Sequence, residues 1–209
     1  MKKRLLPIPL ILLTPIVLLV IVVVAGVYRF SLSDQEIMAK FPTTTIKQDP
    51  IAQAVFGLDV PNPITVPVPE TPSFAFMESW DEQQRWVVGT YDSGSERGSV
   101  ALDTQLMLKL EGFEEQHGYL SVIRVSNQGS GVFNYLALFK YDSLRSRMVM
   151  VSSQLLGDRV DVQSLVQNGG NVTVTLLSHE NNVAFSEAAT ESVSILFSIS
   201  EKYQLSLSN

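Results

Sequence analysis

The residues that could carry catalytic chemistry are few in this chain of 209 residues, which has two histidines, His117 and His179, and no cysteine. A serine hydrolase needs a hydroxyl in contact with a base, and the Gly-x-Ser-x-Gly turn that commonly exposes the serine is absent. Ser178 precedes His179 directly, but adjacency in sequence does not by itself make that contact. We therefore expect no catalytic residue and no enzyme, with a structural role for each histidine.

Three glutamates, Glu111, Glu114 and Glu115, lie close to His117 in the sequence. Glycoside hydrolysis needs two carboxyl groups that face one cleft, and an EF-hand calcium site needs a ligand spacing that this segment lacks. The segment therefore predicts a solvated loop, and we expect no metal and no other cofactor. A hydrolase that uses Glu114 with Glu115, or His179, is the third and weakest functional hypothesis.

Two short motifs are typical of structural turns. The segment Asn127–Gly131 can present backbone N–H groups to an anion, but neither a phosphate-loop lysine nor a predicted helix follows it, which favours a turn between strands. Arg159 and Asp161 are two residues apart and share a strand face, which predicts a structural ion pair between them. Asp158 is predicted to cap the turn beside this pair. The residues of this predicted structural motif are Gly129, Gly131, Asp158, Arg159 and Asp161.

Aromatic side chains supply the best candidate for a binding surface. Those that could line a groove are Trp80, Trp86, Tyr91, Phe133, Tyr135 and Phe139. In the strand predicted at 132–140, alternation places Phe133, Tyr135 and Phe139 on one face. The opposite face carries Leu136 and Leu138. One face belongs to the core, and the other either packs as well or forms a partner surface. The candidate interaction face is therefore the one with Phe133, Tyr135 and Phe139.

A membrane helix is the first element that the sequence predicts. Leu5–Tyr28 contains 24 residues without a charge, and about 20 apolar residues suffice to cross a bilayer. Residues 1–4 contain three basic side chains, so the positive-inside rule places them in the cytoplasm and the rest of the chain outside. A cleaved signal peptide is the alternative, for which Val23–Ala25 is a poor cleavage site.

Residues 29–72 are predicted to form a juxtamembrane helix and a proline-rich stalk. Seven of the ten prolines lie in this range and none follows it, which places a domain boundary near residue 73. The pattern Ser33–Glu36 fits a capping box for a helix that ends near Lys40. The pattern Asp49–Gly57 predicts a second helix of two turns, with proline at its first position and glycine after its end.

The segment 61–72 leaves two alternatives open. Its prolines favour an extended, semi-rigid spacer. Its alternating Ile64, Val66 and Val68 instead favour an edge segment that packs along the domain.

Residues 73–209 change to the period-two alternation of strands. Strands are predicted at 85–91, 99–110, 119–125, 132–140, 148–152, 159–166, 171–177 and 193–199, with a further one in the tail before residue 207. Asn168 and Gly169 suit a type I′ hairpin turn. We therefore predict an all-β domain, a sandwich or open barrel of seven to nine mostly antiparallel strands.

The stretches Asn127–Tyr141 and Ser152–Glu180 resemble a domain of bacterial exported and membrane-anchored proteins whose function is uncharacterised. The matching residues are Gly129, Ser130, Gly131, Phe133, Tyr135, Leu156, Gly157, Asp158, Arg159, Val160, Ser178 and His179. Members often carry an acidic, glycine-containing loop before the Gly-Ser-Gly strand, and this chain departs from that pattern at Gly112–Gly118. The resemblance implies export and a bacterial envelope, and no biochemical activity.

The net charge of the chain bears on the class of partner that we expect. The net charge of −6 argues against a nucleic-acid partner, and all 21 acidic residues follow the apolar segment. We expect a single-pass protein of the bacterial inner membrane, with its N-terminus in the cytoplasm and a non-enzymatic β domain in the periplasm. Its expected partners are the membrane and an envelope protein, and binding of a small ligand or glycan is the alternative.

Overall fold

The computed structural model describes residues 10–31, 48–113, 115, 117–179 and 189–208. It divides the chain into two compact units, Met1–Lys47 and Gln48–Asn209. In the first unit, helix α1 (Leu10–Ser31) contains Pro15, and its apolar side chains from Ile16 to Val24 are exposed.

By length and apolar character, no helix in the described part of the chain qualifies as a membrane span. The predicted N-terminal helix is thus present as α1, and its role as a membrane anchor stays a prediction. The basic residues 1–4 and the helix predicted at 33–40 lie outside the described residues.

The second predicted helix is confirmed as α3 (Pro50–Phe56). The Asp49 carboxylate accepts a hydrogen bond from the backbone N–H of Ala52 at 2.7 Å, which satisfies one of the free donors of the first turn. Gly57 ends the helix with a φ of 68°, a left-handed conformation that glycine adopts without strain. The buried side chains of Ile51, Ala52 and Phe56 attach this helix to the β unit.

Replacing Asp49 by alanine removes this cap, and we expect the free energy of unfolding to fall by about 1 kcal/mol. Urea unfolding followed by tryptophan fluorescence would measure the change, because Trp80 and Trp86 both belong to the β unit. The exposed Asp59, whose side chain makes no hydrogen bond with the described residues, provides the control. Equal losses for Asp49→Ala and Asp59→Ala would contradict a capping role.

The proline-rich segment packs into the β unit, so the second of the two alternatives for residues 61–72 is confirmed. Ile64, Val66 and Val68 are buried. Strand β1 (Thr65–Pro67) pairs in parallel with β9 (Arg147–Asp158) through Thr65 and Val149, and antiparallel with β2 (Phe74–Phe76). The domain boundary predicted near residue 73 was therefore wrong, because burial of the alternating aliphatic side chains outweighs the donors that the prolines lack.

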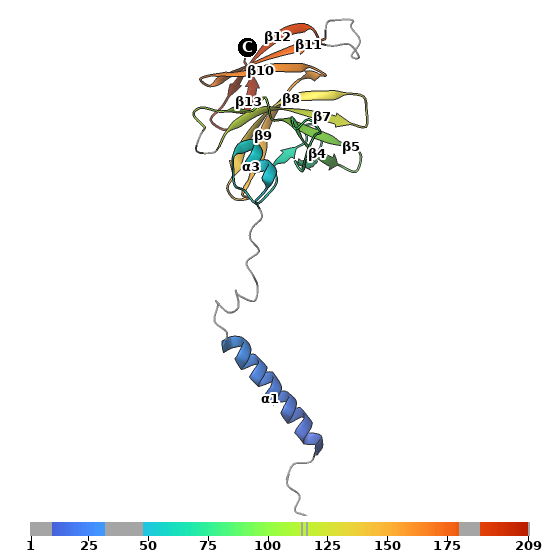
Figure 1. Ribbon diagram of the computed structural model, residues 1–209, viewed down its shortest axis with the longest axis vertical. Coiled ribbons are helices and arrows are strands. Elements are labelled where there is room, and N and C mark those ends of the chain that lie inside the picture. The colour runs from blue at the N-terminus through green and yellow to red at the C-terminus, as the bar shows by residue number, and fades with distance from the viewer. Residues whose placement is uncertain (1–9, 32–47, 114, 116, 180–188, 209) are drawn as a thin grey trace, which may run out of the picture. The chain divides into compact units, whose positions relative to one another are not determined.

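A curled, mixed sheet of nine strands forms a half-barrel (Figure 1). Its order is β2-β1-β9-β8-β7-β5-β4-β3, and β6 pairs with β7. The further bounds are β2 Phe74–Phe76, β3 Ser79–Trp80, β4 Trp86–Asp92, β5 Arg97–Asp103, β6 Leu108–Lys109, β7 Tyr119–Asn127, β8 Val132–Asp142 and β9 Arg147–Asp158. The two edge strands, β2 and β3, follow each other in the sequence with only Met77 and Glu78 between them. The backbone N–H of Met77 donates to the Ile64 carbonyl, and that of Glu78 donates to the Val88 carbonyl.

A second, antiparallel sheet of four strands lies over one face of the half-barrel (Figure 1). Its strands are β10 Asp161–Asn168, β11 Asn171–Ser178, β12 Glu191–Ile199 and β13 Leu205–Leu207. The turn between β10 and β11 consists of Gly169 and Gly170, because Asn168 still pairs with Asn171. Of these two glycines only Gly169 has a positive φ, 61°, which fits a type II′ turn. The predicted type I′ turn at Asn168 and Gly169 was therefore wrong by one residue and in type.

Strands predominate in the described part of the second unit, which confirms the β-rich fold class. The strands outnumber the seven to nine predicted, because β2 and β3 contain only three and two residues, too few for alternation of polarity to be recognised. Strand β1 belongs to the edge segment that was one of the two open alternatives, and β6 lies within a longer predicted strand. The single strand predicted at 99–110 is divided into β5 and β6 because the Asp103 carboxylate accepts hydrogen bonds from the next turn, at Gln105 and Leu106.

Two hydrophobic cores result, and β8 contributes to both. The barrel core, inside the half-barrel, contains Ile64, Val66, Val87, Val100, Leu102, Ile123, Tyr135, Phe139 and Met148, together with α3. The intersheet core contains Leu120, Val122, Leu136, Leu138, Val162, Val172, Val174, Leu176 and Phe197.

The predicted interaction face on β8 is therefore not an exposed surface. Tyr135 and Phe139 are buried in the barrel core, and Phe133 is half-buried against it. The opposite face is covered too, by the second sheet. Phe133, Tyr135 and Phe139 therefore do not form an open surface, because a central strand between two layers buries most of both faces. A role of these residues in binding stays a prediction.

Candidate functional site

The structure describes most of the residues considered for catalysis. His117 has a φ of 48° and lies edge-on to the Tyr141 ring at 6.2 Å between centroids. Glu115 is exposed, Glu114 lies outside the described residues, and His179 directly follows β11. Within the described residues, no group of three or more histidine, aspartate or glutamate side chains is placed to hold a metal.

The two turn motifs are brought together at the corner between β9 and β10. The Asp158 carboxylate accepts a hydrogen bond from the backbone N–H of Val132 at 2.8 Å, and the Arg159 N–H donates to the Val132 carbonyl at 2.8 Å. The Arg159 guanidinium donates to the Ser130 carbonyl in the Gly129–Gly131 turn. This corner therefore joins the start of β8 to the end of β9.

The ion pair at this corner differs from the predicted one. Arg159 lies 3.8 Å from the Asp158 carboxylate. Asp161 instead accepts a hydrogen bond from the Gln163 amide at 2.7 Å. The reason is that Arg159 takes a left-handed φ of 50°, so it stands in a turn and does not share a strand face with Asp161.

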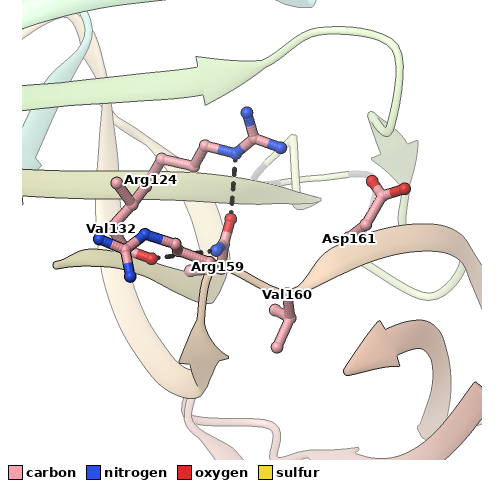
Figure 2. A pocket seen from close by; sticks show the side chains of 6 residues that line it. Arg124, Val132, Arg159, Val160 and Asp161 are labelled. Atoms are coloured by element: carbon pink, nitrogen blue, oxygen red, sulfur yellow. Dashed lines mark hydrogen bonds between the residues drawn. The ribbon is translucent and has the colours of Figure 1, made fainter. Parts of the chain in front are cut away.

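A pocket of about 240 Å³ lies beside this corner, lined by Arg124, Val132, Asn134, Arg159, Val160 and Asp161. Figure 2 shows Arg124 and Asp161 on either side of it, with Val160 between them. The Arg124 Nε donates to the Asn134 side-chain oxygen at 3.1 Å, and the Asn134 amide donates to the Val132 carbonyl at 3.3 Å. This chain of hydrogen bonds holds the Arg124 side chain in one orientation.

Trp86 fixes the same arginine from another side. The guanidinium carbon of Arg124 lies 4.0 Å from the centre of the Trp86 ring, and that of Arg85 lies 5.1 Å from it. Arg85 in turn pairs with the buried Asp103 at 2.7 Å. An arginine stacked on an aromatic ring loses little further freedom when it binds a partner. Strands β4, β5, β7 and β8 thus contribute to one preorganised cluster.

The charges around Arg124 are partly compensated. Burial, followed by the nearby guanidinium of Arg85, lowers the pKa of Arg124, while Asp103 and Asp161 act in the opposite direction. Arginine nevertheless stays protonated at physiological pH. Its two terminal nitrogens make no hydrogen bond with any described residue. They are thus available for a planar acceptor such as a carboxylate, which arginine binds through two parallel hydrogen bonds.

Sequence reasoning included Trp86 in the aromatic set and Arg159 and Asp161 in the turn motif, but it missed Arg124, Asn134 and Asp103. One signal was present. Arg124 is the only charged residue in the predicted strand 119–125, which is otherwise nearly apolar. A charge within a buried strand needs a partner or a function.

Comparison with known proteins found no matching family model, no matching curated protein and no matching solved structure. The resemblance to an uncharacterised bacterial exported domain therefore stays a prediction.

Proposed function

We propose that this chain is a membrane-anchored, non-enzymatic binding protein of a bacterial envelope, whose β unit engages a protein partner through a carboxylate. The uncharged segment Leu5–Tyr28 and the basic residues before it support an anchor with the β unit outside the cytoplasm. The exposed aliphatic side chains of α1 support the same proposal, since they need an apolar environment.

The orientation of Arg124 is the observation that carries the proposal. Its Nε is held by Asn134, its guanidinium carbon lies over the Trp86 ring, and its side chain lines a pocket. Arginine and tryptophan are the residues most enriched at the energetic centres of protein interfaces. A fixed guanidinium with unused donors suits a carboxylate of a partner, from a side chain or a chain terminus.

Arg124→Gln tests the proposal in crosslinked cells that express the full-length, tagged protein. A charge-assisted hydrogen bond contributes about 1.5–3 kcal/mol, so the recovery of a reproducible partner is expected to fall at least about tenfold. Arg124→Lys keeps the charge but not the planar pair of donors, and we expect intermediate recovery. The exposed Arg97, paired with Asp92 on the surface, is the matched control.

Two results would overturn the proposal. One is the recovery of the wild-type protein as a clean monomer without a crosslinked partner. The other is the same partner at the same yield from Arg124→Gln and Arg97→Gln cells, which would place the interface elsewhere. Unfolding curves of both variants provide the check that the β unit is folded.

A further inference from the structure

A second pocket lies at the end of the half-barrel that is away from α3. Strand β7 runs between the two ends: its first residue, Tyr119, packs on Phe56 of α3, and its last, Asn127, lines the pocket. The pocket has a volume of about 150 Å³. Its chemically distinctive lining residues are Glu70, Tyr91, Glu96, Asn127, Phe133 and Tyr135.

The two tyrosines of this pocket are buried without hydrogen-bonded hydroxyl groups. Tyr91 and Tyr135 are only 5% and 6% exposed, and neither hydroxyl has a hydrogen-bond partner among the described residues. Buried tyrosines normally pair this group. Tyr119, at the other end of the same barrel core, does so by donating to the Phe56 carbonyl at 3.1 Å. Neither pocket hydroxyl is among the fully buried side-chain atoms without a partner, so both stay accessible to solvent or a ligand.

Two carboxylates accompany the aromatic rings. Glu96 is held in place, because one carboxylate oxygen accepts from the Asn127 amide at 2.5 Å and the other from the Thr71 hydroxyl at 3.1 Å. Glu70 is exposed at the rim, in a turn where its φ is 63°. No lysine or arginine lines the pocket. Each Glu96 oxygen still has a second lone pair for another donor.

Electrostatic coupling supports the proximity of these groups. Burial raises the pKa of both tyrosines, and Glu96 adds to the effect at Tyr91, as Glu70 does at Tyr135. Both hydroxyls therefore stay neutral at physiological pH. The pocket combines aromatic faces, neutral hydroxyls and negative charge, and each of these interacts favourably with a cation.

We propose that this pocket binds a primary ammonium group, carried by a small alkylamine or by a lysine side chain of a protein. An –NH₃⁺ group has three donors, which match the acceptors that Glu96 and the two tyrosines leave unused. The aromatic rings of Tyr91, Phe133 and Tyr135 accommodate its positive charge and adjoining methylene groups. A quaternary ammonium ion lacks the donors and fits this arrangement less well.

Ligand-observed NMR titrations of the full chain in detergent micelles test the proposal, with butylammonium, tetramethylammonium and sodium chlorides as probes. We expect saturable binding of butylammonium, at least threefold weaker binding of tetramethylammonium, and no saturable effect of sodium. An unsaturable response to butylammonium would overturn the proposal. Equal affinity for the two organic cations would overturn the assignment to a primary ammonium group.

Variants locate the site. Glu96→Gln should weaken butylammonium binding at least tenfold, and Tyr135→Phe, which keeps the ring, should weaken it by three- to tenfold. Glu70→Gln alters no side-chain hydrogen bond in the structure and should weaken binding about threefold without affecting folding. Tyr119→Phe removes a hydroxyl at the other end of the barrel core and should leave affinity unchanged, as should Glu201→Gln on the exposed surface. Unchanged affinity in both Glu96→Gln and Glu70→Gln would overturn the site.

The source of the ammonium group is decided by a further pair of probes, spermidine and Nα-acetyl-lysine N-methylamide. Tighter binding of spermidine assigns a free polyamine, and tighter binding of the lysine derivative assigns a protein side chain. This site lies apart from the Arg124 pocket and shares none of its lining residues. Failure of one proposal therefore leaves the other intact.

Discussion

Replacing Asp103 by alanine is expected to lower the free energy of unfolding by about 3 kcal/mol, near the lower end of the cost of breaking a buried ion pair. The Asp103 side chain is 1% exposed, and it accepts hydrogen bonds from the Arg85 guanidinium at 2.7 and 3.1 Å. It also accepts from the backbone N–H groups of Gln105 and Leu106. Its removal leaves all of these donors without their acceptor.

The exposure of Arg85 moderates the cost. Its side chain is 32% exposed, so water can replace part of what Asp103 supplied. Urea unfolding of the full chain in micelles, followed by tryptophan fluorescence, measures the difference. The matched control is Arg97→Gln, which breaks the exposed pair with Asp92 and should cost less than about 1 kcal/mol. Similar losses in both variants would show that burial does not strengthen the Asp103 pair.

The same substitution bears on the Arg124 pocket. Arg85 pairs with Asp103, and its guanidinium carbon lies 5.1 Å from the centre of the Trp86 ring. Without Asp103, Arg85 loses the acceptor that orients it beside Trp86. We therefore expect partner recovery to fall in Asp103→Ala cells even where the β unit remains folded.

Replacing Phe139 by alanine is expected to destabilise the β unit by about 3–5 kcal/mol, the usual cost of truncating a buried phenylalanine. The side chain is fully buried, and its ring lies 5.7 Å from that of Phe56 between centroids. Truncation would leave a cavity where β8 meets α3, so both the transfer energy and the packing of the helix are lost.

Phe139→Ala also distinguishes burial from a role in partner binding. Chemical unfolding is the measurement, and Phe74→Ala is the control, since Phe74 is 59% exposed and should change stability by less than about 0.5 kcal/mol. If the Phe139→Ala protein were stable but no longer bound its partner, the result would support the exposed interaction face predicted from the sequence. A loss of stability would agree with the buried position of Phe139.

Local signals in the sequence were sufficient for the elements that depend on local interactions. The helix Pro50–Phe56 was predicted with both of its ends, because Asp49, Pro50 and Gly57 act on the backbone next to them. Strands such as β7 and β11 were predicted near their bounds, because alternation within one strand reflects which side is buried. The cap, the turn residues and the strand periodicity each operate over a few residues.

Layer order and pocket composition depended on the tertiary structure. Nothing in the strand 132–140 indicates that a second sheet covers its leucine face while its aromatic face fills a half-barrel. The Arg124 pocket combines residues from β7, β8 and the β9–β10 corner, and Trp86 joins it from β4.

Local residue patterns were enough to predict the β-rich fold class, the N-terminal helix, the capped helix α3 and most strand positions, because these follow from neighbouring residues. Packing in three dimensions was needed to show that residues 48–72 belong to the β unit and that both faces of β8 are largely buried. It also brought together, among the described residues, the donors of Arg124 and the acceptors of the tyrosine pocket. These features arise from contacts between residues far apart in the chain, whose pairing no local pattern encodes.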